Sequence, residues 1–267
     1  MGIRFGHISD MHLEGDAASD SLVRLKAAGG DPLGNTRLAL EELAVDQPDF
    51  LLMTGDLVHE GTAEDYAALH GLLDEILPGV PVIAALGNHD VRDAFRKGFL
   101  GMADGDDSPY VDTLEVCGWR ILSIDSAWEK LLMGGVNDAQ LDWLAEQLEQ
   151  PVEKGNILIC HHPFCPALEH AGMAMPAKLE KILRSGKVSA IFNGHLHKIC
   201  AGWAAGVPHF TGQSLAFDIE VLGSTAIYTT RGGYNMCQVD REGHFFVDSR
   251  IVSPKGNIYQ TKPTKPI

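Results

Sequence analysis

The stretch "VSAIFNGHLH", residues 188–197, joins a short apolar run to a pair of histidines. The run has the composition of a buried strand, and Asn193 and Gly194 separate it from His195 and His197. If the strand continued through the pair, both imidazoles would point to one face, because side chains two residues apart on a strand do so. An isolated His-x-His is most simply a solvated loop, so the rest of the chain decides its meaning.

The same arrangement recurs after four other apolar runs. Each run is followed within a few residues by oxygen or nitrogen donors, often beside a glycine that allows a tight turn. In open α/β sheets, ligands bind at the carboxyl ends of the strands. One such motif is weak evidence, but five together predict a site. The residues are Asp10 and His12, then Asp56, then Asn88, His89 and Asp90, and finally His161 and His162.

Strand-like and helical segments alternate through the first two-thirds of the chain, which favours βαβ units and an α/β fold. Strands are expected at residues 3–8, 49–53, 80–86, 119–124, 156–161 and 188–192. Helices are expected at residues 35–46, 138–150 and 176–186, with Asp138 as the N-cap of the second. We also expect a long loop at 13–34 and consecutive strands after residue 199. The expected domain organisation is one domain over 1–250, followed by a C-terminal tail over 251–267 that ends in the polar "TKPTKPI".

Composition narrows the function classes. The 267 residues include 21 Lys and Arg against 36 Asp and Glu, a formal net charge of −15, which disfavours binding along a nucleic-acid backbone. Five cysteines without a C-x-x-C pair argue against a disulfide framework and a thiolate zinc site. Neither a signal peptide nor an apolar run of membrane-spanning length is visible, so we expect a cytoplasmic protein without a membrane partner.

Residues outside the motifs have simpler expected roles. Trp143, Phe245 and Phe246 are expected in the core, and Cys160 is expected to be buried beside a ligand. Four further histidines are expected at the surface or in structural positions, namely His70, His170, His209 and His244.

The donors at the strand ends are carboxylates, imidazoles and an amide, a set that suits Mn, Fe, Co or Zn. Two carboxylates, one amide and four imidazoles exceed the four ligands of a single tetrahedral ion. We therefore expect two ions that share one bridging carboxylate. Asp56 is the expected bridge, because it stands alone at its strand end.

In their order, the motifs "DMH", "GD", "GNHD", "HHP" and "GHLH" resemble those of the calcineurin-like metallophosphoesterases, over roughly residues 3 to 200. The resemblance implies that one ion is bound by Asp10, His12, Asp56 and His197, and the other by Asp56, Asn88, His161 and His195. His161 is favoured over His162, because the family's histidine stands two residues before a proline, here Pro163. His89 is implied to be the catalytic histidine near the leaving oxygen.

The fold implied by the resemblance is a four-layer sandwich of two packed β-sheets flanked by helices. Protein serine/threonine phosphatases carry "GDxxDRG", whereas this chain has "GDLVHEG", with His59 and Glu60 in place of the Asp-Arg pair. That change removes a phosphate-binding arginine and argues against phosphoprotein substrates. Chain length and the "QLDWL" helix are closer to the bacterial class III cyclic-nucleotide and glycerophosphodiester phosphodiesterases.

These observations predict a metal-dependent phosphoric diester hydrolase that cleaves small phosphodiesters by in-line attack of a metal-bound hydroxide. Cyclic nucleotides, with 3′,5′-cyclic AMP first, are the leading substrates. A glycerophosphodiesterase or phosphomonoesterase on the same site is the alternative, ahead of a nuclease or a metal-free scaffold. Near the motifs, "GNHDVRD" offers only Arg92 and "GHLHK" only Lys198, which favours singly charged diesters over monoesters. The sequence does not decide the oligomeric state, and a homodimer is one alternative. It also leaves open the roles of His59, His162 and Arg231.

Overall fold

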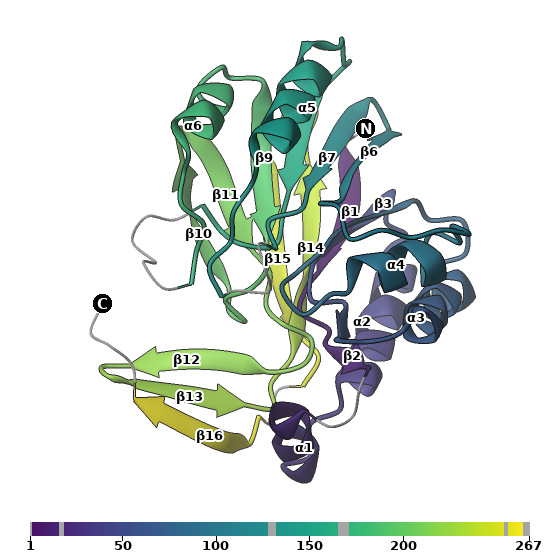
Figure 1. Ribbon diagram of the computed structural model, residues 1–267, viewed down its shortest axis with the longest axis vertical. Coiled ribbons are helices and arrows are strands. Elements are labelled where there is room, and N and C mark those ends of the chain that lie inside the picture. Colours follow the sequence, from purple (N-terminus) through teal and green to yellow (C-terminus); the bar gives the residue numbers. More distant parts are fainter. Residues whose placement is uncertain (1, 16–18, 128–131, 165–170, 254–255, 264–267) are drawn as a thin grey trace.

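Two β-sheets pack face to face at the centre of the computed structural model, which describes residues 2–15, 19–127, 132–164, 171–253 and 256–263 (Figure 1). The first sheet has the order β15-β14-β1-β3-β5, formed by β1 (Ile3–Ile8), β3 (Phe50–Thr54), β5 (Val82–Ala85), β14 (Gly233–Val239) and β15 (Phe245–Ile251). The second has the order β10-β11-β9-β8-β7-β6, formed by β6 (Val111–Val116), β7 (Trp119–Ile124), β8 (Gly155–Ile159), β9 (Val188–Asn193), β10 (Cys200–Ala204) and β11 (Val207–Thr211). Strands β1, β3 and β5 are parallel, as are β7, β8 and β9, so their carboxyl ends reach one edge of each sheet.

Helices cover both outer faces of the sandwich (Figure 1). The first sheet is covered by α2 (Pro32–Asp46), α3 (Ala63–Ile76) and α4 (Arg92–Gly98), and the second by α5 (Asp138–Glu149) and α6 (Ala177–Leu183). Between the sheets, the Phe5 ring stacks on Phe50 with centroids 4.7 Å apart and meets the Phe192 ring edge-on at 5.4 Å. The predicted four-layer sandwich is confirmed.

Smaller elements lie outside this sandwich. A separate sheet of order β12-β13-β16 consists of β12 (Asp218–Leu222), β13 (Thr225–Thr229) and β16 (Ile258–Pro263), and α1 (Asp20–Ala27) lies beside it (Figure 1). Two short strands, β2 (Leu13–Glu14) and β4 (Val58–His59), pair in parallel. These short strands matter for function, because each follows directly on a motif.

The expected long loop at residues 13–34 is wrong, because this segment contains β2, α1 and the start of α2. Helix α1 is stabilised by contacts that are distant in sequence, since Leu22 and Leu25 bury their side chains with Ala216. The N-cap of α5 is Asn137 and not Asp138. Asn137 and Gln140 form a reciprocal capping box, in which each side-chain oxygen accepts a hydrogen bond from the other's backbone N–H.

Part of the expected polar tail is a strand, since β16 pairs antiparallel with β13. Phe246 is 63% exposed, so its expected place in the core is wrong, while Cys160 is fully buried as expected. Of the four other histidines, His209 is buried, His70 and His244 are exposed, and His170 lies outside the described residues. In the part of the chain that the structure describes, no helix is long and apolar enough to cross a membrane.

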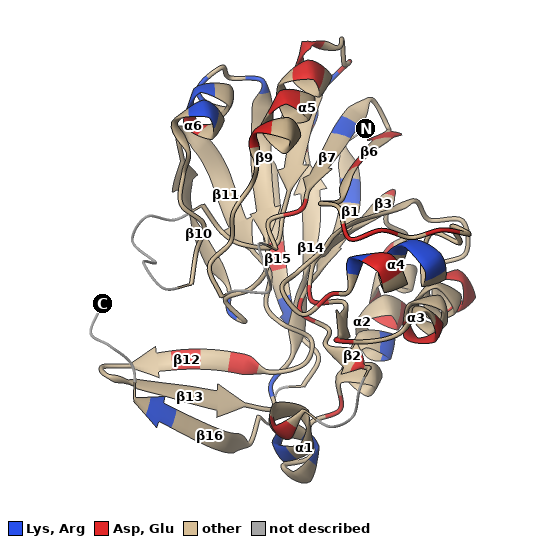
Figure 2. Cartoon of the chain, viewed as in Figure 1, with Lys and Arg blue, Asp and Glu red and all other residues tan. Residues whose placement is uncertain are grey.

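Lys and Arg residues are dispersed over separate elements such as α1, α4 and α6, and acidic residues lie on the same helices (Figure 2). Both arginines that the sequence analysis singled out are engaged in ion pairs. Arg231 contacts Glu220 at 3.2 Å, and the Arg92 guanidinium donates to Asp125 at 2.7 Å. Neither arginine is therefore a free phosphate-binding group in this structure.

Candidate metal centre

The loops that follow β1 and β3 run side by side, joined by a ladder of backbone hydrogen bonds. Asp10 N–H donates to the Gly55 carbonyl at 3.0 Å and His12 N–H donates to the Asp56 carbonyl at 2.9 Å, and the β2–β4 pair continues the ladder. The loop after β9 joins them, because His195 N–H donates to both carboxylate oxygens of Asp10, at 3.0 and 3.1 Å. The carboxyl edges of the two sheets thus meet at one place.

A first group of donors consists of Asp10, His12, Asp56 and His197, whose ligand atoms all lie within 4.8 Å of one another. His197 Nε2 lies 3.2 Å from His12 Nε2 and 3.2 Å from Asp10 Oδ1. All four residues are buried. These are the four residues expected around one ion.

A second group lies on the other side of Asp56. His161 Nε2 is 3.1 Å from His195 Nδ1 and 3.4 Å from Asp56 Oδ2. His162 belongs to the same close group, with its Nδ1 hydrogen-bonded to Ser126 and its Nε2 buried without a partner in the described chain. His161 and His162 thus lie in one group, and the preference for His161 as the ligand stays a prediction.

Asn88 offers an unpaired oxygen just past the carboxyl end of β5. Its Oδ1 is buried and has no hydrogen-bond partner among the residues the structure describes. The next residue, His89, donates its backbone N–H to Asp56 Oδ1 at 2.9 Å, which ties the Asn88 loop to the shared carboxylate. A buried amide oxygen left unpaired is costly, and a cation would satisfy it.

Two histidines adopt the tautomer that leaves a ring nitrogen free to bind a metal ion. His161 Nδ1 lies 2.8 Å from the Thr54 carbonyl oxygen, and His197 Nδ1 lies 2.9 Å from that of Phe217. A carbonyl only accepts, so both Nδ1 atoms carry hydrogen, and in the neutral rings Nε2 keeps its lone pair toward the site. The donor set, the tautomers and the unpaired amide oxygen together fit two metal ions.

Burial and opposite charges shift the pKa values within the site. Burial lowers the pKa of His12 well below its usual value and that of His195 to about 4, which favours the neutral form that binds metals. Burial also opposes a charge on His161, but the adjacent Asp56 carboxylate raises its pKa to about 10. Although burial alone would raise the pKa of Asp56, nearby His161 and His12 hold it well below its ordinary range.

Five of the predicted ligands adopt the left-handed backbone conformation that non-glycine residues rarely use. Their φ angles are 49° at Asp10, 41° at His12, 50° at Asp56, 71° at His195 and 53° at His197. The two histidines of "NGHLH" therefore lie just past the end of β9, as expected, and the strand does not continue through them. The surrounding hydrogen bonds hold these turns in place.

Gly194 lets two of these loops approach closely. A Cβ atom at this position would lie 1.9 Å from Ser9 Oγ and 2.5 Å from Asp10 Oδ2. Ser9 Oγ in turn donates to Asp10 Oδ2 at 2.5 Å. Any larger residue at 194 would push Asp10 out of the first group.

The Asp90 side chain joins the loop after β3 to the loop after β5, a role that the sequence did not indicate. Its carboxylate accepts from Leu57 N–H at 3.1 Å, from Gly87 N–H at 2.8 Å and from the Tyr66 hydroxyl at 2.7 Å. Leu57 follows Asp56, and Gly87 precedes Asn88. Gly87 belongs to the "GNHD" motif, but Leu57 and Tyr66 are 33 and 24 residues away, so no local motif could have revealed those two contacts.

Two groups of buried imidazoles and carboxylates at the rim of a four-layer sandwich could each hold a metal ion. Residues 3–199 match the family model described as calcineurin-like phosphoesterase, and the chain belongs to this family. The predicted family is thereby confirmed, and with it an enzyme that hydrolyses phosphoric esters.

The curated relatives narrow the class. The chain is 32% identical over 232 residues to a protein of Rhodococcus erythropolis named probable cyclic nucleotide phosphodiesterase, covering 81% of this chain and 73% of that protein. It is 33% identical over 243 residues to a cAMP/cGMP dual specificity phosphodiesterase of Mycobacterium tuberculosis, covering 87% and 74% of the two chains. These relatives place the chain with the phosphoric diester hydrolases.

Solved structures agree on the fold alone. A dimetal phosphatase from Danio rerio superposes with a TM-score of 0.55 at 16% identity, covering 94% of this chain and 98% of that one. A purple acid phosphatase from yellow lupin superposes with a TM-score of 0.59, also at 16% identity, covering 98% and 53%.

Proposed function

We propose that the protein hydrolyses small phosphodiesters at a two-metal centre, with cyclic nucleotides as the substrate class and 3′,5′-cyclic AMP as the first candidate. The position of Asp56 carries the proposal. Its Oδ2 lies 3.5 Å from His12 Nε2 and 3.4 Å from His161 Nε2, so one carboxylate faces both donor groups. The names of the curated relatives support the choice of cyclic nucleotides.

Each ion has its own donor set in the proposal. One set is Asp10, His12, Asp56 and His197, and the other is Asp56, Asn88, His161 and His195. When bound, two ions of Mn, Fe, Zn or Co supply positive charge for the phosphoryl oxygens and lower the pKa of water.

His89 is proposed to protonate the leaving oxygen. Its side chain is 32% exposed, whereas the ligand imidazoles are almost fully buried, so it can reach a substrate from the open side. The hydrogen bond from its backbone to Asp56 holds it next to the shared carboxylate. General acids of this kind contribute roughly 10²–10⁴ in rate.

The charges near the site favour a singly charged substrate. Arg92 is held by Asp125, and the chain as a whole carries −15, so few cations are free to neutralise the second charge of a monoester. Glycerophosphodiesters meet the same requirement as cyclic nucleotides and remain the alternative within the class.

Hydrolysis of paired substrates tests the proposal. With saturating Mn²⁺, kcat/KM should be higher for bis(p-nitrophenyl) phosphate than for p-nitrophenyl phosphate, and cyclic AMP should be cleaved. Asp56→Asn should abolish hydrolysis, whereas Asp240→Asn, on the exposed surface, should not change it. A clear preference for the monoester would refute the diesterase, and turnover of glycerophosphoethanolamine without cyclic AMP would refute the substrate class.

A further inference from the structure

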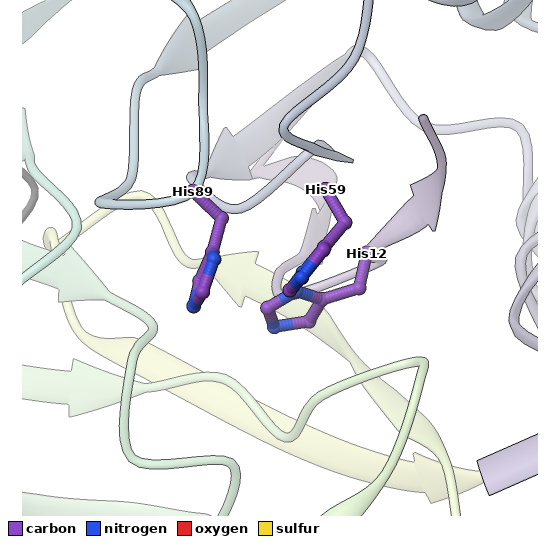
Figure 3. Close-up of side chains that lie close together, drawn as sticks. All are labelled: His12, His59 and His89. Atoms are coloured by element: carbon purple, nitrogen blue, oxygen red, sulfur yellow. The ribbon is translucent and has the colours of Figure 1, made fainter. Parts of the chain in front are cut away.

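His59 lies between a predicted metal ligand and the predicted catalytic histidine. It is the last residue of β4, which pairs with β2 directly after His12, and only 6% of it is exposed. Figure 3 shows its ring next to that of His12 and facing that of His89. Sequence analysis left the role of His59 open, and it stands where "GDLVHEG" departs from the phosphatase pattern.

The contact with His12 is a hydrogen bond between two imidazoles. His12 Nδ1 lies 3.0 Å from His59 Nδ1, while His12 Nε2 faces His197 and Asp56. For Nε2 to offer its lone pair to an ion, Nδ1 must carry the hydrogen and donate it to His59. His161 and His197 use backbone carbonyls for the same purpose, so His12 differs from them in relying on a side chain.

The contact with His89 is a parallel stack. The ring centroids are 4.3 Å apart and the planes differ by 19°. Within the described ranges, the buried His89 Nδ1 has no hydrogen-bond partner, and the nearest carboxylate oxygen, on Glu60, is 4.0 Å away. The His89 ring is thus held by the closer, stacked contact with His59 and by an edge-on contact with the His12 ring, whose centroid is 5.1 Å away.

We infer that His59 is a positioning residue that fixes the tautomer of His12 by accepting its Nδ1–H and fixes the ring of His89 by stacking. The two contacts use different parts of one side chain, its Nδ1 atom and its ring face. The inference rests on the proposed function for the roles of His12 in metal binding and His89 in proton transfer.

Two substitutions separate the contacts. His59→Asn places an acceptor oxygen, Oδ1, at the same bond separation from the backbone as Nδ1 but removes the ring. His59→Phe keeps a flat ring but removes the acceptor. His59→Ala removes both, and His70→Asn and His70→Phe, at a residue with a 48% exposed side chain, are matched controls.

The Mn²⁺ affinity of the metal-free protein, measured by titration calorimetry, should fall about 10–100-fold in His59→Phe, as is typical when the partner of a ligand is lost. In His59→Asn the affinity should stay near that of the wild type, while kcat should fall more for poor leaving groups than for nitrophenolate. Equal losses in both variants would indicate a packing role and overturn the inference. A third Mn²⁺ per chain that disappears in all three variants would also overturn it, because His59 would then be a ligand.

The wild-type protein provides a test that does not depend on the folding of variants. In long-range ¹H–¹⁵N NMR spectra of the metal-free protein, His12 should carry its hydrogen on Nδ1 and His59 on Nε2. The opposite tautomers would overturn the inference whatever the substrate is. Failure to hydrolyse cyclic nucleotides, with these tautomers in place, would refute the proposed function and leave the role of His59 standing.

Discussion

The Asp56 carboxylate contacts both donor groups of the site through one oxygen and the backbone of His89 through the other. Oδ1 accepts the backbone N–H of His89, and Oδ2 faces His12 and His161. Its backbone is in the left-handed region, with φ at 50°, and the ladder to the β1 loop holds it there. A single side chain in this position thus contacts both donor groups and the loop that carries His89.

We therefore predict that Asp56→Ala loses more metal than the alanine variant of any other ligand. Removal of Asp10 or Asn88 weakens one donor group, whereas removal of Asp56 weakens both. Elemental analysis after Mn²⁺ reconstitution and desalting measures the effect, with Asp142→Ala, at a residue whose side chain is 73% exposed, as the surface control. An Asp56→Ala protein that retains one full equivalent while another single variant loses both would show that the bridge is elsewhere.

His89→Ala should keep both ions while kcat falls, because His89 belongs to neither donor group. The loss should be large for a poor leaving group and small for nitrophenolate, which needs no proton. Steady-state kinetics with a series of aryl phosphodiesters measures this dependence. The same loss across the series would mean that His89 acts by another route.

At the level of single residues, the sequence predicted which side chains meet but not what holds them. Strand ends followed by His, Asp and Asn are local signals, and all seven predicted ligands lie at this rim. The carbonyl of Phe217, 20 residues beyond His197, has no sequence signal, because any residue has a carbonyl. The left-handed turns at His195 and His197 were also missed, since non-glycine residues rarely adopt them.

Among the elements, the loops after β3 and β5 are joined by Asp90 and by Tyr66 of α3. The Tyr66 hydroxyl donates to Asp90 at 2.7 Å and accepts the Val91 N–H at 2.9 Å. Through these hydrogen bonds, helix α3 helps to hold the loops after β3 and β5 in position.

Tyr66→Phe should lower the free energy of unfolding by about 1.5–3 kcal/mol, because it removes a buried hydrogen bond to a carboxylate. Urea denaturation of the metal-free protein measures the change. His70→Gln, at an exposed position on the same helix, is the control and should be close to neutral. No loss in Tyr66→Phe would show that the two loops do not depend on this contact.

The helices and strands that sequence analysis found are those with strong local patterns, such as β1, β7 and α5. Two of those it missed are stabilised by distant partners: α1 packs on Ala216, and β16 pairs with β13 about 30 residues earlier in the chain. Helix α3 was also missed, although a capping box formed by Thr62 and Asp65 marks its start locally. Residues 13–34 and the polar tail are weakly apolar, so their structure could not be read from periodicity.

The molecule as a whole is a sandwich in which the site occupies the common edge of two sheets. Packing between the sheets therefore sets the distance between the loops after β1 and β3 and those after β8 and β9. Phe5, Phe50 and Phe192 lie at the centre of that contact, and all three are fully buried.

Phe5→Ala should lower the free energy of unfolding by about 3–5 kcal/mol, through lost burial and the cavity it leaves. Phe246→Ala, at a residue that is 63% exposed, should have little effect and serves as the control. Thermal and urea unfolding provide the measurement. Comparable small losses in both variants would contradict the inter-sheet core described above.

The number of metal ions per chain tests the central claim most directly. The metal-free protein is reconstituted with excess Mn²⁺, desalted and analysed for metal and protein. With two donor groups that share Asp56, the expected result is close to two ions per chain. One ion or none in the folded wild-type protein would contradict the two-metal centre, however the substrates behave.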